Sequence, residues 1–269
     1  MKALNALSKA PIEVRLLGRF SIRGPELRSP DTLPGAAEHL LAYLLVLPSR
    51  RADRETIARD LWGSALSDPS GEISGAMRAI RDLVAPSSGV ALLDEGEDGS
   101  VGIDPGADLW VDLDEFHRVA RGALDVASRS PEEAAKMALT GDRLYEGHLL
   151  EGWTGAWIPG PREATLRTYL EILDALLRHF DAAGDHARVV LYATRTLAAA
   201  PLHENAHWHL ISSLHRLGDD AGALRQYERM AAALSHEAGG ESDPERRAIA
   251  DAVHSAASRL GGRNRESAA

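Results

Sequence analysis

Gly-Asp-His-Ala at residues 184–187 recurs as Gly-Asp-Asp-Ala at residues 218–221, a shift of 34 residues that Leu176 and Leu210 share. This period is typical of tetratricopeptide repeats, in which glycine allows the turn between two paired helices and alanine allows their close approach. The pattern predicts four helices, over residues 165–183, 186–200, 204–217 and 220–236. Stacked helix pairs of this kind present a concave surface that binds proteins or peptides.

The N-terminal part of the chain follows a different pattern. Apolar and polar residues alternate over residues 12–23, which predicts strand structure with a bulge or turn at Gly18. Three helical patterns follow, over residues 36–47, 53–62 and 69–84. Asp53 is placed to N-cap the second of them. Short strand-like pieces at 90–93 and 100–103, with an acidic turn between them, complete the pattern of a winged helix, a variant of the helix-turn-helix.

The predicted protein is mainly α with a small β component: a winged helix-turn-helix domain followed by an all-α helical repeat domain of tetratricopeptide type. We expect the domains to cover residues 1–107 and 108–262, and residues 263–269 to form a disordered tail. A composition of 44% hydrophobic and 26% charged residues is ordinary for a globular protein with a core. The absence of cysteine excludes disulfides, cysteine-ligated metals and a thiol nucleophile. Since no apolar run approaches ~18 residues and no secretory signal opens the chain, we expect a cytoplasmic protein without a membrane partner.

Several stretches of the chain carry a family resemblance. They are Val-Arg-Leu-Leu-Gly at 14–18, His-Leu-Leu-Ala-Tyr-Leu at 39–44, Ile-Ala-Arg-Asp-Leu-Trp at 57–62, Trp-Val-Asp-Leu-Asp-Glu-Phe at 110–116, Tyr-Glu-Gly at 145–147 and Ala-Leu-Arg-Gln-Tyr-Glu at 223–228. In this order and spacing, over nearly the whole chain, the sequence resembles the SARP family of bacterial transcriptional activators, the antibiotic regulatory proteins. Members join a winged helix of response-regulator type to a bacterial transcriptional activator domain that is similar to tetratricopeptide repeats. The resemblance implies a non-enzymatic regulator of secondary metabolism that binds promoter repeats, recruits RNA polymerase and can form a homodimer.

The resemblance also implies where DNA and protein partners bind. In that fold the helix at 69–84 lies in the major groove, the hairpin wing touches the minor groove, and the loop at 63–70 can face RNA polymerase. The residues available for duplex DNA are Ser74, Arg78 and Arg81 on this helix and the cluster Arg50, Arg51 and Arg54. The candidate partner contacts are Asp68 in the loop, Glu95 and Glu97 in the wing, and Trp153 in an aromatic loop of the helical half.

The DNA-facing positions depart from the family pattern. Family recognition helices tend to read Leu-Arg-x-x-Leu-Ser-Arg-Leu-Arg, whereas residues 73–81 read Ile-Ser-Gly-Ala-Met-Arg-Ala-Ile-Arg. The wing, Leu-Asp-Glu-Gly-Glu-Asp-Gly-Ser-Val at 93–101, carries four carboxylates that a phosphate backbone would repel. Residues 1–105 hold 12 Lys and Arg against 15 Asp and Glu, a net charge of −3, although duplex binders normally rely on several cation–phosphate contacts.

Two functions therefore stay open at the level of the sequence. In one, a weakened winged helix binds DNA as a dimer or beside a partner. In the other, the chain is a DNA-binding-deficient relative that acts as a protein- or peptide-binding adaptor or antagonist through its acidic wing and its helical repeats.

A third interpretation comes from residues 203–207, which read His-Glu-Asn-Ala-His. In zinc proteases this spacing places two imidazoles on one helical face, with the glutamate as general base. Glu228 could face His207 across the helix pair as a third ligand. The family resemblance accounts for Glu204, His207 and Glu228 without metal, through a His207–Glu228 contact between repeat helices. We therefore expect no catalytic residue, no metal and no cofactor, and the chain has no Gly-x-x-x-x-Gly-Lys-Ser/Thr loop for nucleotide phosphates.

Overall fold

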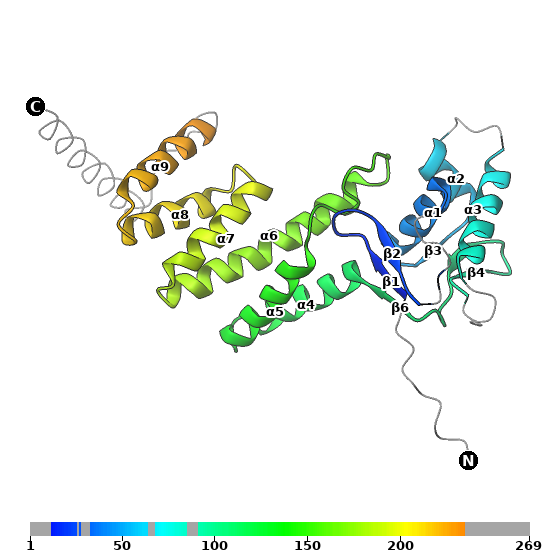
Figure 1. Ribbon diagram of the computed structural model, residues 1–269, viewed down its shortest axis with the longest axis horizontal. Helices are drawn as coiled ribbons and strands as arrows, with labels where there is room; N and C mark the ends of the chain where they lie inside the picture. Colours follow the sequence, from blue (N-terminus) through cyan, green and yellow to red (C-terminus); the bar gives the residue numbers. More distant parts are fainter. Residues whose placement is uncertain (1–11, 26, 28–32, 64–67, 85–90, 235–269) are drawn as a thin grey trace, which may run out of the picture. The chain divides into compact units, whose positions relative to one another are not determined.

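A computed structural model describes residues 12–25, 27, 33–63, 68–84 and 91–234 (Figure 1). The chain divides into two compact units. The first contains Met1–Arg118 and Arg143–Leu166, and the second contains Val119–Asp142 and Arg167–Ala269. The first unit thus takes in residues 143–166, a segment that the sequence assigns to the helical domain. The predicted tail at 263–269 lies outside the described residues.

Two small sheets and three helices form most of the first unit (Figure 1). In the first sheet, β1 (Ile12–Arg15) is antiparallel to β2 (Ser21–Arg23) and parallel to β6 (Leu109–Val111). The helices are α1 (Gly35–Val46), α2 (Arg54–Trp62) and α3 (Pro69–Leu83). The second sheet has the order β3 (Arg51–Ala52), β5 (Val101–Ile103) and β4 (Leu93–Glu95), and its β4–β5 hairpin is the wing. The predicted winged helix is confirmed.

The local signals of the sequence explain the core of this unit. Seven of the twelve residues of α1 are buried, and α3 packs against both α1 and α2. Asp53 caps α2 as predicted, since its side chain accepts a hydrogen bond of 2.8 Å from the backbone N–H of Thr56. Gly18 has a φ of +96°, a left-handed conformation that favours glycine, and it allows the turn between β1 and β2.

Strand β6 is a feature that sequence reasoning missed, because it assigned helix from Leu109 onward. The strand pairs with β1, and Asp112 directly after it is buried. Its carboxylate accepts hydrogen bonds from the backbone N–H groups of Leu16 at 2.8 Å, Leu17 at 3.0 Å and Leu113 at 2.7 Å. Burial nevertheless raises the pKa of Asp112. This one carboxylate fixes the end of β1 and the start of the following helix.

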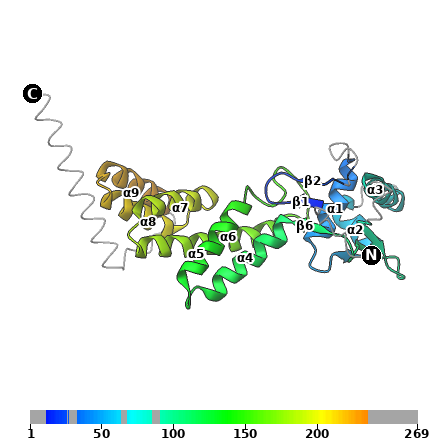
Figure 2. The ribbon, with the colours of Figure 1, turned by 60° about the horizontal axis from the view of Figure 1, so that its bottom comes forward.

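Helices dominate the described residues from Asp112 to Leu234. They are α4 (Asp112–Val126), α5 (Pro131–Leu144), α6 (Pro159–Ala182), α7 (His186–Ala199), α8 (Glu204–Arg216) and α9 (Asp220–Leu234). Within the second unit α7 packs on α8 and α8 packs on α9, as Figures 1 and 2 show. Gly184 and Gly218 precede α7 and α9 with φ values of +68° and +83°. The predicted repeat and the fold class are therefore confirmed. Among the described residues no helix is long and apolar enough to cross a membrane.

Candidate nucleic-acid interface

Helix α3 provides the scaffold of the candidate interface. Asp68 is its N-cap, and its side chain accepts a hydrogen bond of 2.9 Å from the backbone N–H of Gly71. The helix buries one face in the core of the unit and exposes the other. The buried side chains are Ile73, Ala76, Met77, Ile80 and Leu83, and the exposed residues opposite include Ser74, Gly75, Arg78, Arg81 and Asp82. The three α3 residues predicted to contact DNA therefore all lie on its solvent side.

Arg78 lies at the centre of this solvent face. Its side chain is exposed, and within the described residues it makes no ion pair. Ser74 lies one turn before it, and Gly75 has open space where a Cβ atom would be. A guanidinium flanked by such small residues can reach into a groove without hindrance from its own helix.

The acidic residues of the wing are distributed between strand and turn in a way that the sequence did not predict. The expected strand ended at residue 93, with all four carboxylates in the turn, but β4 extends through Glu95. Asp94 and Glu95 thus pair in register with Gly102 and Val101 of β5. Only Glu97 and Asp98 remain in the turn, where the side chain of Asp98 accepts a hydrogen bond of 3.0 Å from the backbone N–H of Ser100. That hydrogen bonding lowers the pKa of Asp98.

Glu95 lies between two arginines that come from different helices. Its Oε1 atom is 2.7 Å from Nη2 of Arg54 in α2 and 3.7 Å from Nη2 of Arg81 in α3. Arg54 also approaches Oγ of Ser74 at 3.4 Å and Sδ of Met77 at 3.5 Å, so its guanidinium extends across to α3. The structure therefore brings together Arg54, Ser74 and Arg81, but around a carboxylate.

Arg50 and Arg51 are also engaged within the fold. Arg51 forms an ion pair with Asp94 and donates a hydrogen bond of 3.1 Å to Oγ of Ser100. Arg50 has a φ of +55°, pairs with Asp114 and donates to the backbone carbonyl of Leu45. Burial lowers the pKa of Arg50. These contacts give Arg50 a structural role at the start of the wing sheet.

Two of the candidate partner residues also have structural contacts. Asp68 caps α3, as described above. Trp153 is partly buried, and its ring centroid lies 5.5 Å from that of Phe20 and 4.4 Å from that of His39. Arg162 donates a hydrogen bond of 3.2 Å to its backbone carbonyl. Glu97, in contrast, is exposed at the tip of the wing.

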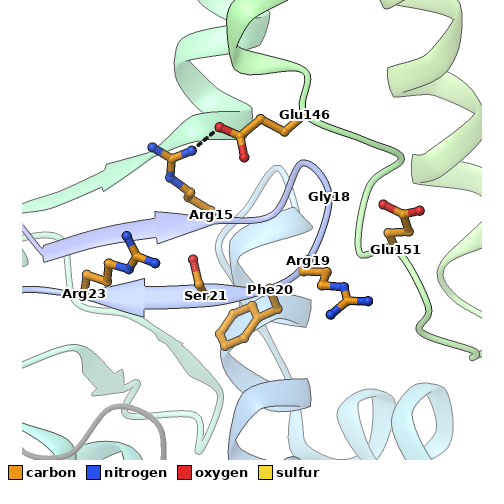
Figure 3. A pocket seen from close by; sticks show the side chains of 8 residues that line it. All are labelled: Arg15, Gly18, Arg19, Phe20, Ser21, Arg23, Glu146 and Glu151. Atoms are coloured by element: carbon orange, nitrogen blue, oxygen red, sulfur yellow. Dashed lines mark hydrogen bonds and ion pairs between the residues drawn. The ribbon is translucent and has the colours of Figure 1, made fainter.

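A cavity of about 520 Å³ beside the β1–β2 turn was not foreseen from the sequence (Figure 3). It is lined by Arg15, Gly18, Arg19, Phe20, Ser21, Arg23, Glu146 and Glu151. The only signal for it is the repetition of arginine at every fourth position from Arg15 to Arg23. Arg15 forms an ion pair with Glu146, marked by the dashed line in Figure 3. Because its lining has three guanidinium groups and two carboxylates, the cavity has only a small net positive charge and would attract a polyanion weakly.

The His-Glu-x-x-His segment is used inside the helical repeats. His207 is buried, its Nε2–H donates to the carbonyl of Pro201 at 2.9 Å, and its Nδ1 accepts from Nε2 of Gln226 at 2.7 Å. The expected His207–Glu228 contact is wrong, because α9 turns Gln226 inward and leaves Glu228 exposed. His203 is the N-cap of α8. Since both ring nitrogens of His207 are engaged, neither has a lone pair free for zinc, and the described part of the chain holds no group of three or more potential ligands for a metal.

Comparisons with known proteins agree with this architecture. The family described as bacterial transcriptional activator domain matches residues 111–254. The structure of Mycobacterium tuberculosis EmbR in complex with a low-affinity phosphopeptide is similar with a TM-score of 0.71 and 19% sequence identity, over 93% of this chain and 69% of that one. At this identity the likeness concerns the fold. A comparison with curated proteins gives no match. Together these findings confirm the resemblance to the SARP activators that the sequence motifs indicated.

Proposed function

Because this chain belongs to the bacterial transcriptional activator domain family, we propose that it regulates transcription by binding duplex DNA, with α3 in the major groove. The observation that carries the proposal is the solvent face of α3, where Arg78 is exposed beside the small residues Ser74 and Gly75. Arginine is the side chain that most often reads a base edge in the major groove, through two hydrogen bonds to guanine. Arg78 is in this proposal the residue that reads the sequence.

The remaining cations position the protein on the phosphates in this proposal. Arg54 and Arg81 lie beside or on α3 and Arg51 lies in the sheet of the wing, but each has a carboxylate partner in the wing. Since phosphate contacts supply most of the non-specific affinity of DNA-binding proteins, such a surface binds duplex DNA weakly without its operator. Binding as a homodimer to a repeated operator adds a second α3 and compensates for the weak single contact.

The test is capture of fragmented duplex DNA by the purified full chain at two salt concentrations, followed by sequencing of the retained DNA. We expect enrichment of a repeated sequence. Arg78→Ala should weaken binding to that sequence by about 1–3 kcal/mol and relax its specificity at one base position. Arg225→Ala is the matched control, since it removes an exposed arginine from α9 in the other unit and should leave binding unchanged. Equal enrichment by the wild type and the Arg78→Ala variant would contradict the assigned role of Arg78.

The proposal extends to recruitment of RNA polymerase in the cytoplasm, without catalysis or a cofactor. The contact we assign to polymerase is the loop at 63–70, of which residues 64–67 lie outside the described structure. Because the carboxylate of Asp68 caps α3, its replacement should alter α3 as well as the loop. In-vitro transcription from the captured DNA, with substitutions at residues 64–67, separates the two effects. Loss of activation with retained DNA binding is the expected result.

A second function is favoured by one specific observation, the pairing of the wing carboxylates with the cations around α3. A chain that has lost DNA binding would act as an adaptor or antagonist that binds a protein or peptide through its helical repeats. EmbR, in the similar structure, holds a phosphopeptide. Co-purification of a defined partner by a chain that enriches no DNA sequence would favour this second function.

A further inference from the structure

We propose that Glu95 sets the DNA affinity of this protein, because it holds Arg54 and Arg81 in ion pairs that compete with DNA phosphates. This inference rests on the proposed function, since it concerns the surface that would meet the duplex. Within the part of the chain that the structure describes, Glu95 is the carboxylate shared by α2, α3 and the wing.

The geometry makes Glu95 a bridge. One oxygen, Oε1, serves both arginines, at 2.7 Å from Arg54 and 3.7 Å from Arg81. The contacts of Arg54 with Ser74 and Met77 hold its guanidinium over α3, beside the helix that would enter the groove. A phosphate that approached Arg54 or Arg81 would therefore meet a carboxylate in the same place.

The exposure of the three side chains makes the bridge breakable. Relative exposures of 33% for Arg54, 45% for Glu95 and 55% for Arg81 leave all three groups partly hydrated. Exposed ion pairs are weak, and salt screens them. Such a bridge contributes little to folding, yet the negative charge still lowers the attraction of the two arginines for phosphate. Its main effect is thus on DNA affinity.

Asp94 does not provide the same control. It lies on the opposite side of β4 and pairs with Arg51, whose guanidinium also donates to Ser100 within the wing sheet. Side chains of successive strand residues point to opposite faces, so Asp94 cannot reach α3 while Glu95 does. Glu95 alone therefore controls the two arginines beside α3.

The expected effect can be estimated from counterion release. Each additional phosphate contact steepens the slope of log K against log salt by about 0.9 and raises affinity on the order of tenfold near 0.1 M salt. Glu95→Gln keeps the size of the side chain and removes its charge. We expect this variant to bind duplex DNA roughly tenfold more tightly near 0.1 M salt, with a salt slope steeper by about one, as for one additional phosphate contact.

The experiment measures duplex binding by fluorescence anisotropy over a salt series for the full chain. Three variants accompany the wild type: Glu95→Gln, Glu97→Gln, and Glu95→Gln combined with Arg81→Ala. Glu97→Gln is the matched control, because it removes the same charge from the same wing at a residue that has no ion pair among the described ones. We expect a large gain for Glu95→Gln, a small one for Glu97→Gln, and partial loss of the gain in the double variant.

The binding measurements can contradict the Glu95 bridge alone, or the bridge and the proposed function together. Equal gains for Glu95→Gln and Glu97→Gln would overturn the inference, since wing charge would then act at long range without the bridge. Unchanged binding in Glu95→Gln, with weakening by Arg78→Ala, would overturn the bridge and leave the proposed function standing. Absence of duplex binding in the wild type and in every variant, with unchanged circular dichroism, would overturn both.

Discussion

Two carboxylates in different units of the chain show opposite uses of an ion pair. Asp142 in the second unit has a side chain only 5% exposed, pairs with Arg195 of α7 and accepts a hydrogen bond of 3.0 Å from the hydroxyl of Tyr169 in α6. Glu95 in the first unit pairs with two arginines at the surface. Each carboxylate connects three elements of secondary structure, but one is closed off from solvent and the other is open to it.

Burial decides whether a charged side chain stabilises the fold or remains available for binding. A buried carboxylate needs its partners, because removal of its charge or of a partner leaves polar groups unsatisfied. An exposed carboxylate can exchange protein partners for water, ions or DNA at little cost in stability. We therefore expect substitutions of Asp142 to affect folding, and those of Glu95 to affect binding.

The largest effect should come from Asp142→Ala. The substitution removes the carboxylate that accepts a hydrogen bond from the hydroxyl of Tyr169 and pairs with Arg195, where α5, α6 and α7 meet. The loss should be about 2–3 kcal/mol in the free energy of unfolding, less than for a fully buried pair because Arg195 remains partly hydrated. Urea unfolding followed by circular dichroism measures it.

Glu115→Ala serves as the control for that measurement. Glu115 pairs with Arg118 one helical turn away on α4, and this surface pair should contribute far less to the free energy of unfolding than Asp142 does. If both substitutions lowered stability equally, the contrast between buried and exposed carboxylates would not hold for this chain.

The sequence predicted those parts of the fold whose cause is local. Gly184 and Gly218 identified the helix turns, and Asp53 identified the start of α2, because each acts on its own neighbours. Strand β6 escaped prediction, since three residues carry no periodic signal and their partner β1 is far away along the chain. The inward turn of Gln226 instead of Glu228 depends on how α9 packs on α8, which no local pattern encodes.

The candidate interface divides in the same way. The helical periodicity of residues 69–84 was sufficient to place Ser74, Arg78 and Arg81 together on one surface helix. The pairing of Glu95 with Arg54 and Arg81 could not be predicted, because it joins residues 41 and 14 positions apart through the fold of the wing. The acidic wing therefore indicated repulsion of DNA in the sequence, whereas the structure shows neutralisation of specific cations.

His39 is intermediate in exposure between the buried Asp142 and the exposed Glu95, and its effect on stability should appear at acidic pH. Burial against Trp153 lowers the pKa of His39 below its ordinary value. With the lower pKa in the folded state, the unfolded chain binds the proton more tightly. The contribution of neutral His39 is thus fully present above the unfolded pKa of about 6.5 and is lost as pH falls through the folded value.

We expect the free energy of unfolding to fall as the pH is lowered below about 6.5, because protonation of His39 then favours the unfolded chain. His39→Gln should remove that part of the pH dependence, which thermal unfolding at several pH values measures. The fluorescence of Trp153, taken as the difference from a Trp153→Phe variant, should change over the same range. A pH profile identical in the wild type and His39→Gln would show that the ring stays hydrated and that the contact with Trp153 has no effect on its protonation.

The smallest effect on stability should come from Glu95→Gln, because both of its ion pairs lie at the surface. The substitution breaks ion pairs that water can replace, so the free energy of unfolding should change by less than about 0.5 kcal/mol. Relief of repulsion among the remaining acidic wing residues even favours the folded state slightly. Thermal unfolding in low and high salt measures the change, which should shrink as salt screens the pairs.

A loss of 2 kcal/mol or more, as large as that expected on removal of Asp142 (about 2–3 kcal/mol), would mean that the bridge holds the wing against α3 as a structural contact. In that case an increase in DNA affinity would report a loosened wing instead of freed arginines, and the salt slope would remain that of the wild type.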